Sequence, residues 1–219
     1  AIIGDVISNL LKFNGHDVIK EYYVNDFGGQ IKNFVLSVYH RILEIKENKK
    51  FPIDENLYPG LYIINIAKKI IEEKSIKNFN NFEKIYDDLL KMSLNFSVKL
   101  IKNNLNMLGV VHDSFVYESE LIKNNTVTKV IDDLKKNNYV YEGKLEAPKS
   151  EVDNKWKPRN QLLFNSSKFD DDTDRPLQKI DGSWTYFASD IAYHSNKINR
   201  KYDVLINILG ADHAGYIKR

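Results

Sequence analysis

The chain has 219 residues, which allow one large domain or one domain that carries an insertion. Hydrophobic residues make up 42% of it, too many for a disordered chain, and the formal net charge of +2 gives no overall reason to expect a nucleic-acid binder, so any basic surface has to be local. The lack of cysteine excludes disulfides and cysteine-ligated zinc. No apolar run approaches the roughly 18 residues that span a bilayer, and the first residues lack a basic leader, so we expect a cytoplasmic protein without a membrane partner.

The first fifty residues predict one unit of an α/β fold. Apolar residues recur at helical spacing over residues 1–14, and Gly15 follows where a helix end favours glycine. Residues 18–24 predict a strand, the sequence NDFGGQ a loop, and residues 30–48 a second helix. The order helix, strand, loop, helix is typical of α/β proteins.

The middle of the chain changes character. Residues 61–74 and 80–104 are long helical stretches rich in lysine and asparagine, so we interpret residues 50–104 as a helical insertion with a charged, solvated face. Residues 105–116 return to apolar and β-branched side chains and predict a strand. Residues 119–137 predict a helix with Ser119 as its N-cap.

The last part predicts a β excursion followed by a helix and a buried strand. Pro148 and Pro158 favour a β-rich insertion over residues 139–166 rather than a helix. The segment SWTYFASDIAYHSNKINR predicts a helix that starts near Ser183, and residues 203–209 are apolar on both faces, which indicates a buried parallel strand. We therefore predict an α/β fold whose parallel sheet includes residues 18–24, 105–116 and 203–209.

Three short segments are candidate binding sites. Gly210, Asp212 and His213 follow the predicted strand 203–209, where α/β proteins bind nucleotides; an ordinary turn with a capping aspartate would look the same. Tyr186 and Asp190 are four residues apart on the predicted helix, so they share a face, and a carboxylate beside an aromatic ring suits a guanidinium. The alternative is an exposed aspartate beside a core tyrosine.

The third segment is EYYVNDFGGQ, in which Asn25 and Asp26 end a predicted strand. These residue types also dominate plain turns, so their role stays open. The acidic segment DDDTDRPLQKID has aspartates at offsets similar to those of a calcium loop, but Arg175 stands where that loop needs glycine and Asp181 where it uses glutamate. The histidines show no metal-ligand spacing, so we expect no metal site built from protein ligands.

Taken in order, these segments resemble the arginyl-tRNA synthetase family in its bacterial form over nearly the whole chain. The most specific pair is SWTYFASDIAYH with GADHAGY, and the supporting segments are GDVISNLLKFNGHDV, EYYVNDFGGQ, YPGLYI, LGVVHDSFVYES and YEGKLEAPK. The resemblance implies a class I synthetase core, that is, a Rossmann-type parallel sheet with helical and β insertions. It also implies the activation of L-arginine by ATP, with Mg²⁺, and its transfer to tRNA(Arg), with no DNA partner.

Matched position by position, the resemblance assigns Tyr186 and Asp190 to the arginine side chain. It places His213 beside both arginine and ATP, and Gly210 and Asp212 at the nucleotide; Asn25 and Asp26 become candidate pocket residues without an assigned role. The family's His-x-Gly-His motif would precede Ala1 and its Lys-Met-Ser-Lys-type loop would follow Arg219, and the N-terminal and anticodon-binding domains are likewise missing from the sequence. We therefore expect a partial catalytic domain over residues 1–219, with no catalytic motif of its own and inactive by itself. The alternative is a non-catalytic relative that binds arginine or tRNA.

Overall fold

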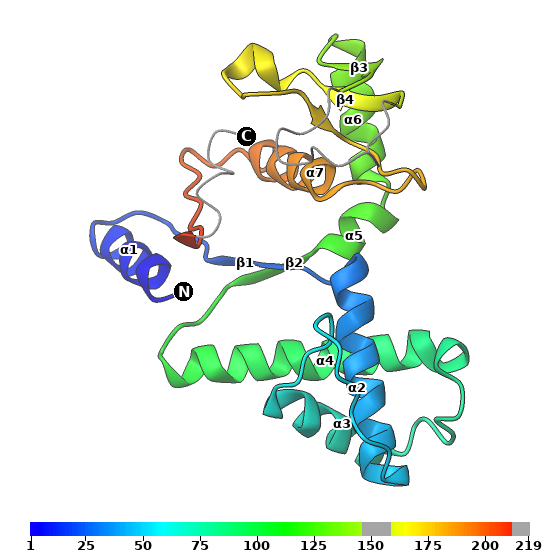
Figure 1. Ribbon diagram of the computed structural model, residues 1–219. Coiled ribbons are helices and arrows are strands. Elements are labelled where there is room, and N and C mark those ends of the chain that lie inside the picture. The colour runs from blue at the N-terminus through cyan, green and yellow to red at the C-terminus, as the bar shows by residue number, and fades with distance from the viewer. Residues whose placement is uncertain (146–158, 212–219) are drawn as a thin grey trace. The chain divides into compact units, whose positions relative to one another are not determined.

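The computed structural model describes residues 1–145 and 159–211 (Figure 1). The chain divides into two compact units, Ala1–Val116 and Tyr117–Arg219. Each described unit has its own hydrophobic core. No helix of the described residues is long and apolar enough to cross a membrane.

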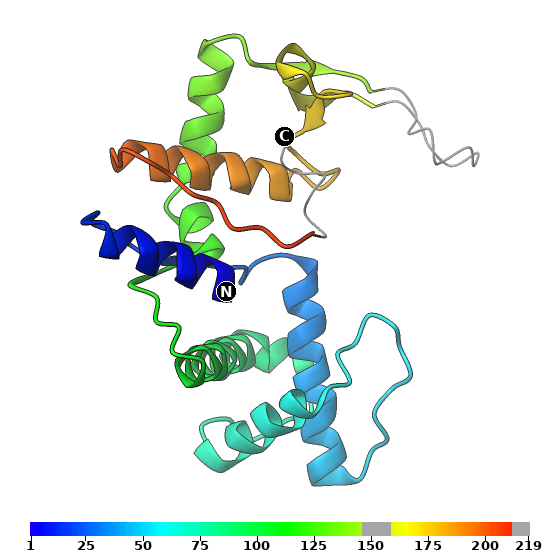
Figure 2. The same ribbon diagram turned by 90° about the vertical axis from the view of Figure 1, so that its left-hand side faces the viewer.

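The first unit is mostly helical. It contains α1 (Ile2–Phe13), β1 (Glu21–Val24), α2 (Gly29–Glu47), α3 (Leu61–Glu73), α4 (Phe82–Met107) and all but the last residue of β2 (Ser114–Tyr117). Helices α2, α3 and α4 pack against one another, as both views show (Figures 1 and 2). Their shared core is aliphatic, with Val35, Val38, Ile42, Ile63, Ile70 and Leu89 all fully buried. The helical spacing of these apolar residues along each segment is what the sequence pattern predicted.

Strands β1 and β2 form a parallel pair (Figure 1). The backbone amides of Asp113 and Ser114 both donate to the carbonyl of Lys20, at 2.8 and 3.2 Å, and two residues further along each strand the ring of Tyr22 lies 5.5 Å from that of Phe115. The contacting residues advance by two along both segments, from Lys20 to Tyr22 and from Asp113 to Phe115, so the strands run parallel. The predicted α/β class is therefore confirmed.

The predicted strand at residues 105–116 is largely wrong. Helix α4 continues to Met107, and the backbone amides of Leu108, Gly109 and Val110 bond back to the carbonyls of its last turn. Gly109 takes a positive φ of 74°, which ends the helix at little steric cost. The strand begins only at Ser114. The apolar run had combined the end of a helix, a helix-terminating turn and the start of a strand.

The second unit combines helices with an antiparallel sheet. Helix α5 (Glu118–Lys123) and helix α6 (Thr126–Lys136) replace the single predicted helix over residues 119–137, because Asn125 adopts a left-handed conformation between them. Strands β3 (Val140–Gly143), β4 (Gln161–Phe164) and β5 (Arg175–Pro176) follow, with Val140 opposite Phe164 and Leu163 opposite Pro176. A 3₁₀ turn, Ser166–Phe169, lies between β4 and β5. Helix α7 (Tyr186–Asn199) closes the unit over the buried residues Val127, Ile131, Leu177, Ala188 and Ala192.

The predicted strand at residues 203–209 is wrong among the described residues. The segment forms no ladder there, and its apolar side chains are exposed; Val204, for example, is 73% exposed. A buried parallel strand needs hydrogen-bonding neighbours and covering layers on both faces. Among the described residues this segment has no strand partner, and its apolar side chains stay exposed.

Thr185 is the N-cap of α7, which begins at Tyr186, three residues after the predicted start near Ser183. Its hydroxyl accepts the amide of Ala188 at 3.4 Å and donates to the carbonyl of Pro176 at 2.9 Å, so one side chain both caps the helix and joins it to β5. Ser183 instead donates to Asp181 at 2.6 Å, within the preceding turn.

Thr185→Ala is expected to lower the free energy of unfolding by about 1 kcal/mol, because the helix loses its capping oxygen. In a chain of this size that corresponds to a fall of roughly 2–4 °C in the melting temperature, measured by circular dichroism. Ser183→Ala is the control and should change it by less. Equal losses from the two substitutions would mean that Thr185 has no special capping role.

Candidate functional site

One face of α7 carries a continuous polar and aromatic stripe. Tyr186 and Asp190 are four residues apart on this helix, and Tyr193 and Lys197 extend the same face at spacings of seven and eleven residues from Tyr186. The opposite side of the helix is buried and built from small residues, Ala188, Ser189 and Ala192. These small side chains allow α7 to pack closely against α5 and α6. The core therefore fixes the direction in which the Tyr186–Lys197 stripe points.

The N-terminal end of the stripe is the more open one. Tyr186 is 41% exposed, and the Lys179 ammonium lies 5.8 Å from the centre of its ring. Asp190 is partly buried. A half-buried carboxylate next to an aromatic ring can accept both hydrogen bonds of a planar guanidinium while the ring packs against its apolar stem.

The C-terminal end of the stripe is closed by a buried lysine. Lys197 is only 9% exposed; its ammonium lies 4.4 Å from the centre of the Tyr193 ring and donates to Oδ1 of Asn207 at 2.5 Å. A buried ammonium needs such partners, since a charge without them is costly. The bond holds the segment 203–209 against α7, and Gly210 follows Asn207 by three residues. Burial, aided by the nearby charge of Lys197, also lowers the pKa of His194 on the same helix, which favours its neutral form.

The other predicted nucleotide residues are placed only in part. Gly210 is described and exposed. Asp212 and His213 lie outside the described residues, so the prediction that they share a pocket with Tyr186 and Asp190 stays a prediction.

Asn25 and Asp26 follow directly after β1 in the first unit. Asn25 is exposed, whereas Asp26 is only 8% exposed. Gly28 then takes a φ of 97°, and α2 begins at the next residue. The chain thus turns sharply between a parallel strand and a helix with a carboxylate held inside the turn. This is the type of position at which α/β folds present polar groups to ligands.

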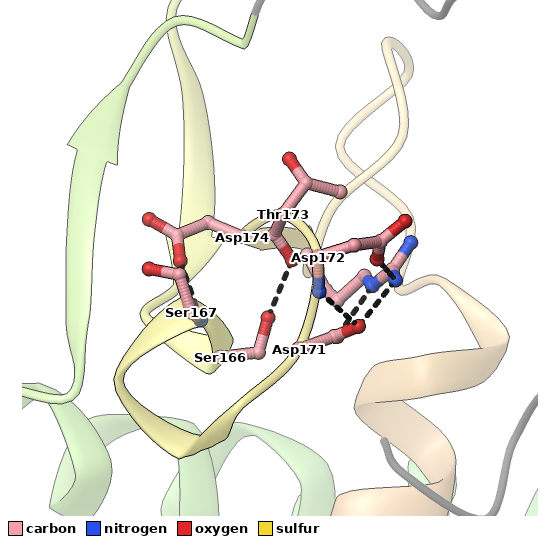
Figure 3. A network of polar contacts seen from close by, with 7 residues as sticks. Ser166, Ser167, Asp171, Asp172, Thr173 and Asp174 are labelled. Atoms are coloured by element: carbon pink, nitrogen blue, oxygen red, sulfur yellow. Dashed lines mark hydrogen bonds and ion pairs between the residues drawn. The ribbon is translucent and has the colours of Figure 1, made fainter.

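The acidic segment before α7 is used for internal contacts (Figure 3). Arg175 donates from Nε and Nη2 to both carboxylate oxygens of Asp171, at 2.7 and 2.6 Å, and also contacts Asp172. Ser166 donates to the carbonyl of Thr173 at 2.8 Å. On the other side of the turn, Asp174 accepts the backbone amide of Ser167 at 3.0 Å and the hydroxyl of Tyr141 at 2.5 Å. The carboxylate of Asp174 raises the pKa of Tyr141 to about 12, because it is the acceptor of the phenol proton.

The sequence interpretation did not single out three residues that are notable in the structure. Tyr193 and Lys197 continue the α7 stripe, and helical spacing from Tyr186 could have identified them. Glu118, the first residue of α5, is only 2% exposed. No sequence signal distinguishes it from a solvated glutamate, because its burial follows from tertiary packing.

Comparison with known proteins identifies the class to which this fold belongs. The family model of the catalytic domain of class I tRNA synthetases, of the type designated R, matches residues 1–219. The chain belongs to this family.

The individual relatives are all named for the same amino acid, arginine. The chain is 60% identical over its whole length to an arginine–tRNA ligase of Pelagibacter ubique and 47% identical to one of Orientia tsutsugamushi. It spans 38% and 37% of the lengths of these two enzymes. A crystal structure of a putative arginyl-tRNA synthetase from Campylobacter jejuni superposes with a TM-score of 0.82 at 31% identity, covering 98% of this chain and 44% of that one.

Proposed function

We propose that this chain is part of an arginine–tRNA ligase, which activates L-arginine with ATP and transfers it to tRNA(Arg). The observation that carries the proposal is the α7 stripe. It presents Asp190 beside Tyr186 in a chain that matches the class I catalytic domain along its whole length. A carboxylate and an aromatic ring on one helix face provide what the arginine side chain needs and what a smaller or uncharged side chain does not use.

In this proposal Asp190 accepts the guanidinium and Tyr186 packs against the substrate's side chain. The arginine carboxylate then attacks the α-phosphorus of ATP, forms arginyl-adenylate and releases pyrophosphate. A ribose hydroxyl at the 3′ end of the tRNA attacks the carbonyl carbon of the adenylate and releases AMP. Mg²⁺ enters with ATP as part of the substrate. Holding the reactants in line supplies much of the acceleration in such a step.

The remaining assignments extend the proposal to the nucleotide. In the proposal Gly210, Asp212 and His213 bind ATP, and His213 also contacts arginine. The bond from Lys197 to Asn207 supports this placement, since it ties the stripe of α7 to the segment that leads into Gly210. Asn25 and Asp26 are proposed as further pocket residues because they stand at the carboxyl end of β1.

The proposal also covers the organisation of the chain. Residues 50–104 and 139–166 are proposed as insertions in the catalytic domain. The first range contains α3 and most of α4, and the second contains β3 and β4.

ATP–pyrophosphate exchange by the full-length protein tests the proposed function. We expect exchange to depend on arginine and to be far weaker with lysine. The assay is run with and without tRNA(Arg), so that a requirement for tRNA in the activation step is detected. Exchange with a different amino acid would exclude arginine as the substrate. Arginine binding without any exchange, even with tRNA present, would favour the non-catalytic alternative.

A further inference from the structure

A groove of about 300 Å³ lies between α3 and α4 in the first unit, and none of the residues assigned above lines it. Helix α3 contributes Tyr62, Asn65, Lys68 and Lys69, and α4 contributes Phe96 and Leu100. Tyr62, Asn65 and Lys69 recur at spacings of three and four residues, so they form one face of α3. The groove is therefore lined by apolar and aromatic side chains together with two lysines and one glutamate.

Two lysines from different helices converge on the ring of Phe96. The Lys69 ammonium lies 5.7 Å and the Lys99 ammonium 5.8 Å from the ring centre. These cation–π contacts hold the two charges near the groove rather than leaving them to spread into solvent. Lys68 and Lys69 line the groove with one acidic residue, Glu72, and the Lys99 ammonium lies beside the groove on the Phe96 ring. The local charge is therefore positive, although the whole chain is near neutral.

Tyr62 supplies an aromatic surface at the edge of the groove. It is 40% exposed, and its ring lies against the backbone of Gly60, where an added Cβ would meet Cε1 of the ring at 2.6 Å. Burial and the nearby Tyr58 raise the pKa of its phenol, so the ring stays uncharged at neutral pH. A ring backed by glycine can offer a face to a stacked base at little cost in side-chain entropy.

We propose that the α3–α4 groove is an RNA-docking surface that holds the sugar–phosphate backbone on Lys68, Lys69 and Lys99 and stacks one base on Tyr62. Ammonium groups bind phosphates as point charges, and a base adds the aromatic contact that an acidic peptide lacks. The identification of this RNA as a tRNA rests on the proposed function. The inference that the groove binds RNA rests on its own side chains.

The test measures binding of a fluorescein-labelled tRNA(Arg) transcript to the full-length protein by fluorescence anisotropy, between about 50 and 200 mM salt. The groove variant is Lys68→Gln with Lys69→Gln and Lys99→Gln. Its matched control is Lys77→Gln with Lys84→Gln and Lys91→Gln. This variant removes the same charge from lysines of the same unit that are neither among the groove-lining residues nor among the lysines at the Phe96 ring. Circular dichroism confirms that each variant is folded.

We expect the groove variant to bind the transcript at least about tenfold more weakly at low salt. The slope of log affinity against log salt should fall by roughly two to three, or about one for each phosphate that the protein no longer neutralises. Tyr62→Leu should weaken binding about tenfold while leaving the salt slope unchanged, because it removes stacking and no charge. The control variant should keep the slope of the parent to within about one.

Three outcomes would overturn the groove assignment: equal losses from the groove and control variants, an unchanged salt slope in the groove variant, or displacement of the RNA by polyglutamate as effective as displacement by an unlabelled RNA of equal charge. Failure of the proposed function looks different. In that case the full-length protein gives no arginine-dependent exchange, yet the groove variant still loses RNA affinity relative to its control.

Discussion

Replacing Asp190 by asparagine in the full-length protein is expected to weaken arginine binding by about tenfold to a hundredfold and to leave ATP binding nearly unchanged. The substitution keeps the shape of the side chain but removes its charge. A hydrogen bond to a charged group is worth on the order of 1.5–3 kcal/mol, which gives that range of affinity. The measurement is the Michaelis constant for arginine and for ATP in pyrophosphate exchange.

Discrimination against lysine should fall in the same variant. A lysine ammonium cannot use the two parallel acceptors of a carboxylate as a planar guanidinium does. Under the proposed function, much of the preference for arginine over lysine therefore depends on that geometry. Asp133→Asn is a suitable control, because Asp133 pairs with Lys136 on α6, where both side chains are at least 70% exposed. Unchanged Michaelis constant and turnover for arginine in the Asp190 variant would remove this residue from the site.

The helices could largely be predicted, because the spacing of apolar residues within a segment is a local property of the sequence. Helices α1, α2 and α3 begin and end within two residues of the predicted ranges. Each is amphipathic, and α2 and α3 pack one face against the core of the first unit, whereas α1 has no buried residue. In α2 and α3 the spacing of the apolar residues therefore reflects their burial, while in α1 the same spacing predicts the helix without burial in the described residues.

Strands were predicted less well because pairing is not local. The run at 105–116 mixed a helix end with a strand start, since leucine and valine occur in both. The run at 203–209 has the composition of a buried strand, but whether it pairs depends on neighbours far away in the sequence. Only the segments 21–24 and 114–117 have a partner strand of the parallel kind among the described residues.

The candidate site shows the same division between local and non-local information. That Tyr186 and Asp190 share a face followed from their spacing once the helix was predicted. The burial of Lys197, Glu118 and Asp26 did not follow, because these charged residues are inside only through tertiary packing. A sequence pattern assigns charged side chains to the solvated face by default, and buried charges are the exceptions that it cannot identify.

Asp171→Asn is expected to lower the free energy of unfolding at pH 7 by on the order of 1.5–3 kcal/mol, because Arg175 loses a paired carboxylate that accepts two of its hydrogen bonds. The side chains of Asp171 and Arg175 are only 6% and 17% exposed, so solvent replaces that partner poorly. The hydrogen bonds from Arg175 hold the pKa of Asp171 below its ordinary value. A carboxyl whose pKa is lower in the folded state stabilises the fold above its unfolded pKa of about 3.9, and the contribution is lost as the pH falls from there toward the folded value.

Urea unfolding of the parent and the Asp171 variant between pH 7 and pH 3 measures this contribution, and the difference between them should shrink below about pH 4. Asp172→Asn is the matched control in the same turn. Asp172 contacts the same guanidinium, but its side chain is 83% exposed, so its loss should cost no more than about 1 kcal/mol. Equal destabilisation by the two substitutions, or a difference that stays constant down to pH 3, would show that the paired Asp171–Arg175 contact does not stabilise the turn that leads to α7.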